Sequence, residues 1–130
     1  MSMTHLNPET LHRNPAFTQI ITVEAPAKLI YIGGQNAVNT KGEIVGDDLG
    51  SQTQQVMKNM LAALEAAGAK MENVVKITIY VVQGQALEQG FAAYSQFLDQ
   101  GVNPPTISVI IVAGLANPKF LIEMEAIAAV

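Results

Sequence analysis

The sequence predicts an α+β domain in which two helices cover one face of a mixed β-sheet. Apolar residues recur three and four positions apart in two separate segments, which is the spacing of a helix with one buried side. The other apolar segments are rich in valine, isoleucine and threonine, which favour strands. Strands and helices follow one another in the order β-β-(β)-α-β-α-β-β, so the sheet should be mixed.

The first two strands are expected at residues 17–23 and 28–34. Both segments are rich in β-branched residues and a short turn with a proline separates them, so we expect them to pair as a hairpin. A loop punctuated by asparagine and glycine then covers residues 35–46, with a short strand inside it at about residues 43–45.

The first helix is expected at residues 49–67, with Asp47 or Asp48 as its N-cap and Gly68 ending it. Its predicted buried residues are Val56, Met57, Met60, Leu61 and Leu64. Its predicted solvent-facing residues are Gln52, Gln55, Lys58, Asn59 and Glu65. This separation predicts that the helix packs on the sheet with one side only.

The second half of the chain begins with residues 74–82, a nearly continuous β-branched run that predicts a central strand. A second helix is expected at residues 86–100, ended by Gly101, and two prolines separate it from a strand at residues 106–113. The last strand is expected at residues 120–129. The residues that the second helix should bury are Leu87, Phe91, Tyr94 and Leu98.

The length of 130 residues suits a single domain with its own core. We predict an N-terminal tail over residues 1–15 and one domain over residues 16–130. Hydrophobic residues make up 49% of the chain and charged residues only 14%, which is few for a monomer of this size. The sheet face opposite the helices is therefore expected to pack against other copies of the chain in a closed oligomer.

The charge pattern argues against nucleic acid and membranes as partners. The net charge is -4, and the seven basic residues are spread singly rather than clustered. No apolar run approaches the roughly 20 residues that cross a membrane, and the first residues lack the pattern of a secretion signal. The chain has no cysteine, which removes disulfides and thiolate chemistry. We expect a soluble, cytoplasmic protein.

Several kinds of site are disfavoured by the positions of the residues that they need. Both histidines lie in the predicted tail, so we predict neither a metal site nor a serine-type catalytic triad. Gly33 and Gly34 precede a loop rather than a helix, so they do not form a phosphate-binding turn. We interpret them as a bend whose backbone N–H groups could bind a carboxylate or a carbonyl.

Glu123 and Glu125 are the strongest candidates for chemistry. They stand two residues apart in an apolar strand, so both should point to one face of the sheet. Carboxylates are rarely buried without a partner. This face either opens into a polar cleft, where a carboxylate could act in acid-base chemistry, or pairs a carboxylate with Lys28 or Lys76. The residue types alone favour the two interpretations equally.

Motifs along the whole length from Phe17 resemble the Rid family, also called YjgF or L-PSP endoribonuclease-like proteins. The matching motifs are Ile-Gly-Gly-Gln35, Gln52-Thr53, Asn59, Leu-Glu-Ala-Ala-Gly68, Glu-Asn-Val-Val-Lys76, Tyr80-Val81, Pro104-Pro105 and Leu-Ile-Glu-Met-Glu-Ala-Ile-Ala128. The resemblance implies a chorismate-mutase-like fold, a homotrimer and small-molecule clefts at the subunit interfaces. It further implies hydrolysis of 2-imino and enamino acids to 2-oxo acids and ammonia, without a cofactor.

The position of the family's substrate-binding arginine differs in this chain. In the family, this arginine follows the proline-rich turn and grips the substrate carboxylate. Alignment on Pro105 and Ser108 places it at Ile107, with Thr106 as the less favoured register. Neither side chain can form the two parallel hydrogen bonds by which a guanidinium holds a carboxylate.

Other site positions implied by the resemblance differ as well. The family's tyrosine falls at Phe17, its serine at Gly33 and its asparagine on the second helix at Phe91, whereas Gly34 and the water-orienting Glu123 are kept. These changes predict a more apolar cleft and a less anionic ligand. We expect hydrolysis of an imine or enamine that differs from the usual 2-imino acids. The alternative is a non-catalytic trimer that binds a metabolite or has a regulatory role, and the acidic charge disfavours a ribonuclease.

Overall fold

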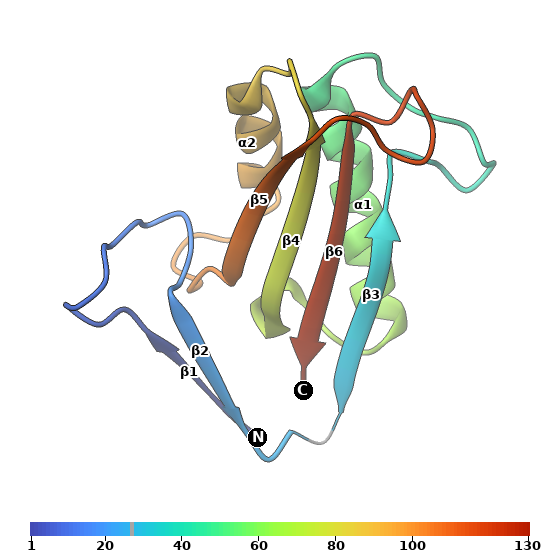
Figure 1. Ribbon diagram of the computed structural model, residues 1–130. Coiled ribbons are helices and arrows are strands. Elements are labelled where there is room, and N and C mark those ends of the chain that lie inside the picture. Colours follow the sequence, from blue (N-terminus) through green and yellow to red (C-terminus); the bar gives the residue numbers. More distant parts are fainter. Residues whose placement is uncertain (27) are drawn as a thin grey trace.

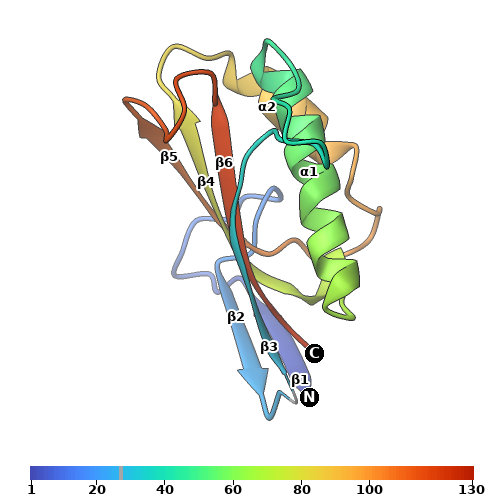
Figure 2. The same cartoon turned by 90° about the vertical axis from the view of Figure 1, so that its right-hand side faces the viewer.

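The computed structural model of the protein describes residues 1–26 and 28–130. Two helices lie next to each other on one face of a four-stranded sheet, as the edge-on view shows (Figure 2). A two-stranded ribbon formed by the N-terminal residues projects away from this sheet (Figure 1). The predicted α+β class and the placement of both helices on one face are confirmed.

The sheet has the strand order β3-β6-β4-β5. Its strands are β3 (Leu29–Gln35), β4 (Val74–Val82), β5 (Thr106–Val112) and β6 (Ile122–Ala129). β4 runs parallel to β5, and β6 runs antiparallel to both β3 and β4. The sheet is therefore mixed, and β4 lies inside it, as the β-branched run predicted.

The helices are α1 (Leu49–Ala66) and α2 (Leu87–Ser95), and a short 3-10 helix, η1 (Met71–Asn73), precedes β4. Asp48 caps α1, because its carboxylate accepts a hydrogen bond of 2.7 Å from the backbone N–H of Ser51. The Ser51 hydrogen bonds hold the pKa of Asp48 below its usual value. Gly68, with φ of +76°, follows the C-cap. Both predicted ends of this helix are confirmed.

The second helix is shorter than the periodicity predicted. It ends at Ser95, and Leu87 and Phe91 are 47% and 58% exposed instead of buried. The side of α2 that faces α1 carries Gly90, where an added Cβ would lie 2.9 Å from a Leu49 methyl group, and Tyr94. Because α2 packs on α1 with this side, its Leu87 and Phe91 side stays open toward β5.

Gln52 is buried, although its position in the helix predicted exposure. Only 1% of its surface is accessible, and its side-chain amide forms hydrogen bonds with backbone groups only. Its side-chain amide donates to the carbonyls of Gly46 (3.1 Å) and Lys119 (2.8 Å), and its oxygen accepts from Leu121 N–H (2.9 Å). Gln52 thus links the loop before α1 to the loop before β6. Periodicity along the helix cannot predict such contacts between distant segments. Leu61, in contrast, is only half-buried.

The N-terminal residues form regular structure, which the prediction of a tail over residues 1–15 missed. β1 (Ser2–Leu6) pairs antiparallel with β2 (Ile20–Glu24). The predicted hairpin between β2 and β3 is absent from the described chain, because β2 pairs with β1 instead. The short strand expected near residues 43–45 is reduced to a single bridge between Val38 and Ile44.

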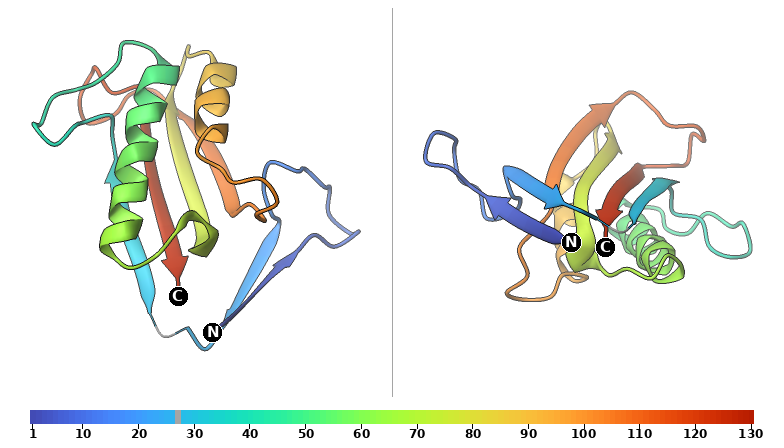
Figure 3. Two further views of the ribbon diagram at one scale, coloured as in Figure 1. Left: turned by 180° about the vertical axis from the view of Figure 1, so that it is seen from behind. Right: turned by 90° about the horizontal axis from the view of Figure 1, so that it is seen from below.

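The core lies between the sheet and the helices, seen from behind in Figure 3. Its completely covered side chains include Met57, Met60, Leu64, Ile77 and Met124. The opposite sheet face carries no helix in the described residues and mixes Tyr31 and Ile110 with Lys76, Thr78, Tyr80, Glu123 and Glu125. It is more polar than the sequence suggested. No helix in the described chain is long and apolar enough to cross a membrane.

Candidate functional site

Glu123 and Glu125 share the open face of the sheet, as their spacing predicted. In the antiparallel register, Glu123 lies opposite Tyr80 and Glu125 lies opposite Thr78. The residues between them, Met124 and its neighbours at every second position, are buried toward the helices. Both carboxylates are therefore half-buried on a strand whose other side belongs to the core.

Glu123 is held by polar neighbours at the end of β3. The side-chain amide of Asn36 donates to Glu123 Oε1 (3.3 Å) and to the carbonyl of Ile122 (3.1 Å). Asn36 is fixed in turn, because Asn59 donates to its carbonyl at 3.0 Å. Asn36 was not predicted as a site residue, although it directly follows the Gly-Gly-Gln35 motif. The Glu123 carboxylate therefore accepts one side-chain hydrogen bond, from Asn36, and remains partly exposed to solvent.

Gly34 lies so close to Glu123 that a side chain at position 34 would displace the Glu123 carboxylate. A Cβ at position 34 would lie 2.6 Å from Glu123 Oε2, whereas a Cβ at Gly114 would meet nothing within 4 Å. Gly34→Ala is expected to displace the carboxylate and to lower any hydrolysis that depends on it by roughly 100-fold, because catalytic groups tolerate little misplacement. Hydrolysis rates and melting temperatures of Gly34→Ala and the control Gly114→Ala would check this. Equal rates in both variants would contradict the role of the close approach.

Glu125 has a different partner. The hydroxyl of Tyr80 donates to Glu125 Oε1 at 3.0 Å, and this hydrogen bond raises the pKa of Tyr80 above its usual value. The predicted alternative of a Lys28 pair is wrong, because Lys28 Nζ donates to the carbonyl of Ala67. Lys76 does lie with Glu125 on the wall of a shallow cavity of about 360 Å³. Glu125 thus forms a hydrogen bond with a side chain of the neighbouring strand β4.

Phe17, Phe91 and Ile107, three of the predicted substrate-binding residues, meet in one pocket. This apolar pocket, of about 440 Å³, lies between α2, β4 and β5. Its lining is formed by Ala16, Phe17, Leu49, Thr53, Ile79, Val81, Leu87, Gly90, Phe91, Tyr94, Ile107, Val109, Ile122 and Met124. Apart from Thr53 and Tyr94, every lining residue lacks a polar side chain. Such a pocket suits a neutral, apolar group.

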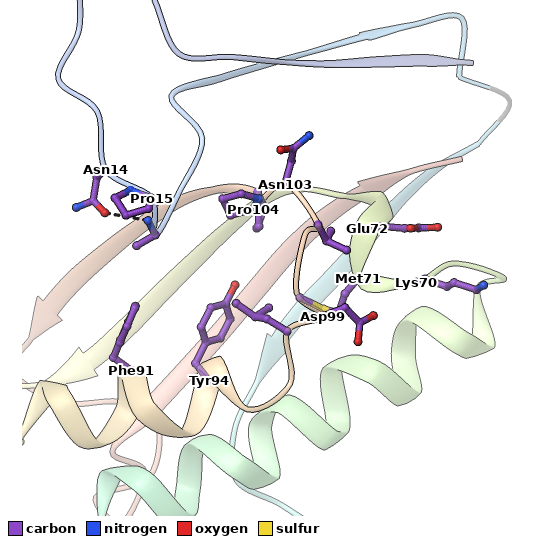
Figure 4. A pocket seen from close by; sticks show the side chains of 14 residues that line it. Asn14, Pro15, Lys70, Met71, Glu72, Phe91, Tyr94, Asp99, Asn103 and Pro104 are labelled. Carbon is purple, nitrogen blue, oxygen red and sulfur yellow. Dashed lines mark hydrogen bonds between the residues drawn. The ribbon is translucent and has the colours of Figure 1, made fainter.

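Tyr94 was predicted as a core residue, yet its hydroxyl has no hydrogen-bond partner in the described chain. The residue is only 4% exposed, and burial raises its pKa to about 12. It separates the apolar pocket from a neighbouring pocket of about 540 Å³, which Asn14, Asp99 and Pro104 also line. Figure 4 shows Tyr94 and Phe91 projecting from α2 into this space.

The buried phenol of Tyr94 predicts a loss of stability at alkaline pH. Below pH 10 the phenol is neutral in both states, so this group has no effect on the pH dependence. Above pH 10 the unfolded chain ionises while the folded protein keeps the proton up to about pH 12, so unfolding becomes easier by up to about 3 kcal/mol. Urea unfolding of wild type and Tyr94→Phe at pH 8 and pH 11 should show a smaller fall for the variant. Parallel falls would contradict this effect.

The predicted site residues fall into two groups on opposite faces of the sheet. Glu123 and the two glycines lie on the open face, near the ends of β3 and β6. Phe17, Phe91 and Ile107 line the apolar pocket on the helix side, where the neighbours of Glu123, namely Ile122 and Met124, form the floor. A single chain therefore brings Glu123 together with Gly33 and Gly34 but not with Phe17, Phe91 and Ile107.

Metal ligands do not gather in the described part of the chain. Within residues 1–26 and 28–130, no three histidine or acidic side chains lie close enough to hold an ion. His12, which the sequence placed in a solvated tail, lies edge-on against the ring of Phe17, with 6.0 Å between the ring centres. This histidine packs beside the apolar pocket.

Known proteins similar to this chain point to one family. A family model described as Endoribonuclease L-PSP matches residues 11–130. A candidate regulator, AldR, of Lactococcus lactis is 39% identical over 124 residues, covering 85% of this chain and 96% of the relative. A 2-iminobutanoate/2-iminopropanoate deaminase of Salmonella typhimurium is 34% identical over 102 residues, covering 77% and 78%. The crystal structure of the Rid-family protein YyfB of Yersinia pestis superposes with a TM-score of 0.87 at 36% identity, covering both chains completely. The chain is thus a member of the Endoribonuclease L-PSP family, to which the Rid and YjgF proteins belong.

Proposed function

We propose that this protein hydrolyses an imine or enamine that lacks the carboxylate of 2-imino acids, without a cofactor. The observation that supports the proposal is that the chain keeps the family's glutamate but lacks the family's arginine. Glu123 remains, held by Asn36 beside Gly34, while the position of the family's arginine is Ile107 in an apolar pocket. The relative named as a 2-iminobutanoate/2-iminopropanoate deaminase supports the reaction class.

The chemistry follows from a single carboxylate near a bound imine. A water oxygen attacks the imine carbon while the Glu123 carboxylate takes one proton from that water. Glu123 passes this proton to the imine nitrogen, which gives a carbinolamine. The hydroxyl proton of the carbinolamine then moves through Glu123 to the nitrogen, and the carbon–nitrogen bond breaks to release ammonia and a carbonyl compound. The apolar pocket would hold the carbon skeleton, and the N–H groups at Gly33 and Gly34 would orient the polar end.

The proposed cleft requires two copies of the chain. Glu123 and the apolar pocket lie on opposite faces of the sheet, so one subunit supplies the carboxylate and its neighbour supplies Phe17, Phe91 and Ile107. The homotrimer implied by the resemblance to the Rid family would provide such interfaces. The open sheet face, with the half-buried Glu123 and Glu125, is the surface that we expect the neighbour to cover.

The proposal can be tested with imines made in place by another enzyme. Threonine dehydratase supplies 2-iminobutanoate and 2-aminoacrylate, and an amine-oxidising enzyme supplies imines without a carboxylate from simple primary amines. We expect faster loss of the second kind in the presence of the protein and little effect on the first. Strong acceleration of 2-iminobutanoate hydrolysis would contradict the interpretation of Ile107. If the protein accelerates the hydrolysis of neither kind of imine, the proposed hydrolysis is wrong and a non-catalytic binding role is favoured.

A non-catalytic binding or regulatory trimer is the second candidate. It is favoured by the similarity to the candidate regulator AldR and by the apolar pocket with the unpartnered Tyr94 hydroxyl. A thermal-shift screen with neutral, apolar metabolites that carry one hydrogen-bonding group would test it. A rise in melting temperature without hydrolysis would support this candidate, and silence across the screen would count against it.

A further inference from the structure

The N-terminal arm, defined as residues 1–24, carries a two-stranded ribbon that has no further partner strand in the described residues. In the described residues, its strands β1 and β2 pair only with each other. An isolated two-stranded ribbon is marginally stable in water, because it buries little apolar surface. Leu6 and Ile20 on this ribbon are 42% and 38% exposed. The arm therefore needs a further surface to pack on.

The arm is attached to the rest of the chain at Thr18, beside β5. Thr18 is 2% exposed, its backbone N–H donates to the carbonyl of Pro105 at 3.0 Å, and its hydroxyl donates to the carbonyl of Pro104. These prolines directly precede β5, so β2 begins at the β5 edge of the sheet, as Figure 1 also shows. The arm is thus attached to one edge of the sheet by buried hydrogen bonds.

The strand that β2 was predicted to join is at the other edge. In the order β3-β6-β4-β5, two strands separate β3 from β5. Neighbouring strands are about 4.8 Å apart, so β3 lies roughly 14 Å from β5. The arm cannot lie along β3 of its own chain while Thr18 keeps its bonds. The outer edge of β3 consequently stays open in the described chain, and open edges readily take up another strand.

The connection between β2 and β3 favours an arm that does not fold back onto β3 of its own chain. Only four residues, 25–28, separate the two strands. The first of them, Ala25, has φ of +48°, a conformation that non-glycine residues rarely adopt, and Pro26 follows it. Short, strained connections between strands favour the exchange of an element between copies, because a tight hairpin would strain them further.

The side-chain pattern of β2 fits the free edge of β3. Ile21 and Val23 are half-buried on one side of β2, and Ile30 and Ile32 on β3 are 8% and 7% exposed toward the core. An antiparallel pairing with Val23 opposite Ile30 and Ile21 opposite Ile32 continues the core side from one strand to the next. Thr22 and Tyr31 then lie opposite each other on the outer side.

Part of the N-terminal segment superposes on a solved crystal structure. The 102 residues from 29 to 130 are 78% of the chain, so a superposition of these residues alone could not give a TM-score above about 0.78. The Yersinia pestis structure reaches 0.87 over the complete chain. The arm must therefore contribute to the superposition.

We propose that copies of this chain exchange their arms. β2 of one subunit adds antiparallel to β3 of the next and extends its four-stranded sheet to six strands. Because each subunit gives one arm and receives one, the contacts can close into a symmetric ring. The exchange depends on the edges of the sheet and not on the imine chemistry proposed above.

Cysteine pairs provide a direct test, because the natural chain contains no cysteine. Thr22 and Tyr31 are exposed, so Thr22→Cys with Tyr31→Cys should fold normally. After oxidation, or after treatment with a short bismaleimide to allow for a shift in register, denaturing gels without reductant should show covalently joined chains. Mixed single variants, Thr22→Cys with Tyr31→Cys, should join to each other as well.

The matched control is Tyr31→Cys with Ile127→Cys, since these residues lie opposite each other on β3 and β6 of one chain. This pair should give only single chains with an internal bond. If the Thr22 and Tyr31 pair also gives internally linked single chains, the hairpin closes on its own subunit and the exchange is wrong. If neither reagent links that pair while the control pair forms, the arm does not lie on β3 of any copy, which equally overturns the proposal.

Discussion

Replacing Ile107 with arginine is expected to raise the hydrolysis of 2-imino acids by roughly 30- to 1,000-fold, which corresponds to about 2 to 4 kcal/mol of transition-state binding. Ile107 lines the apolar pocket together with Phe17 and Phe91, so the guanidinium would enter the part of the cleft proposed to hold the substrate. There it would offer two parallel N–H donors to a carboxylate. The coupled threonine dehydratase assay would measure the gain.

The matched control is Ile111→Arg, which adds the same charge on the same side of β5. Ile111 is 52% exposed and lies outside the apolar pocket, so this variant should leave the rate unchanged. Ile107→Lys adds the charge without the planar fork and should give a smaller gain. If Ile107→Arg folds and assembles like the wild type but gains nothing, the cleft has diverged beyond this one contact.

Replacing Glu123 with glutamine is expected to lower hydrolysis of the preferred imine by about 100- to 10,000-fold, the range typical of general acid-base groups. Glutamine keeps the shape of the side chain and an oxygen that can accept the hydrogen bond from Asn36. It removes the ability to take a proton from water. The melting temperature should therefore change little while the rate falls.

Glu125→Gln is the matched control for Glu123→Gln. Glu125 lies two residues away on the same face, and its carboxylate accepts a hydrogen bond from Tyr80. We expect this variant to keep most of the activity, because Tyr80 can donate to the amide oxygen. An equal loss of rate in both variants would point to the charge of the face rather than to proton transfer at Glu123. Full activity of Glu123→Gln would exclude it as the base.

For much of the site, the sequence predicted which residues take part but not which residues they contact. The spacing of Glu123 and Glu125 correctly placed both on one face, because side chains on a strand alternate. Their partners, Asn36 and Tyr80, could not be predicted, since they come from other strands and loops. The meeting of Phe17 with Ile107 depends on where the arm is rooted, at the prolines before β5.

The largest error in the fold has a related cause. Residues 17–23 and 28–34 have the composition of a hairpin, and strand propensity together with a short turn correctly predicted two strands there. Which strand pairs with which depends on long-range contacts, here the buried bonds of Thr18 and the pairing of β2 with β1. Gln52 is a similar case, because its burial follows from three backbone groups of distant loops.

The sequence by itself determined the α+β class, the caps of α1, the inner position of β4 and the shared face of the two glutamates. These features depend on the period of apolar residues and on local hydrogen bonds, which neighbouring residues decide. Only the tertiary structure decided the direction of the arm, the burial of Gln52 and the separation of Glu123 from the apolar pocket. These depend on which distant segments meet, and alternation along one strand carries no information about that.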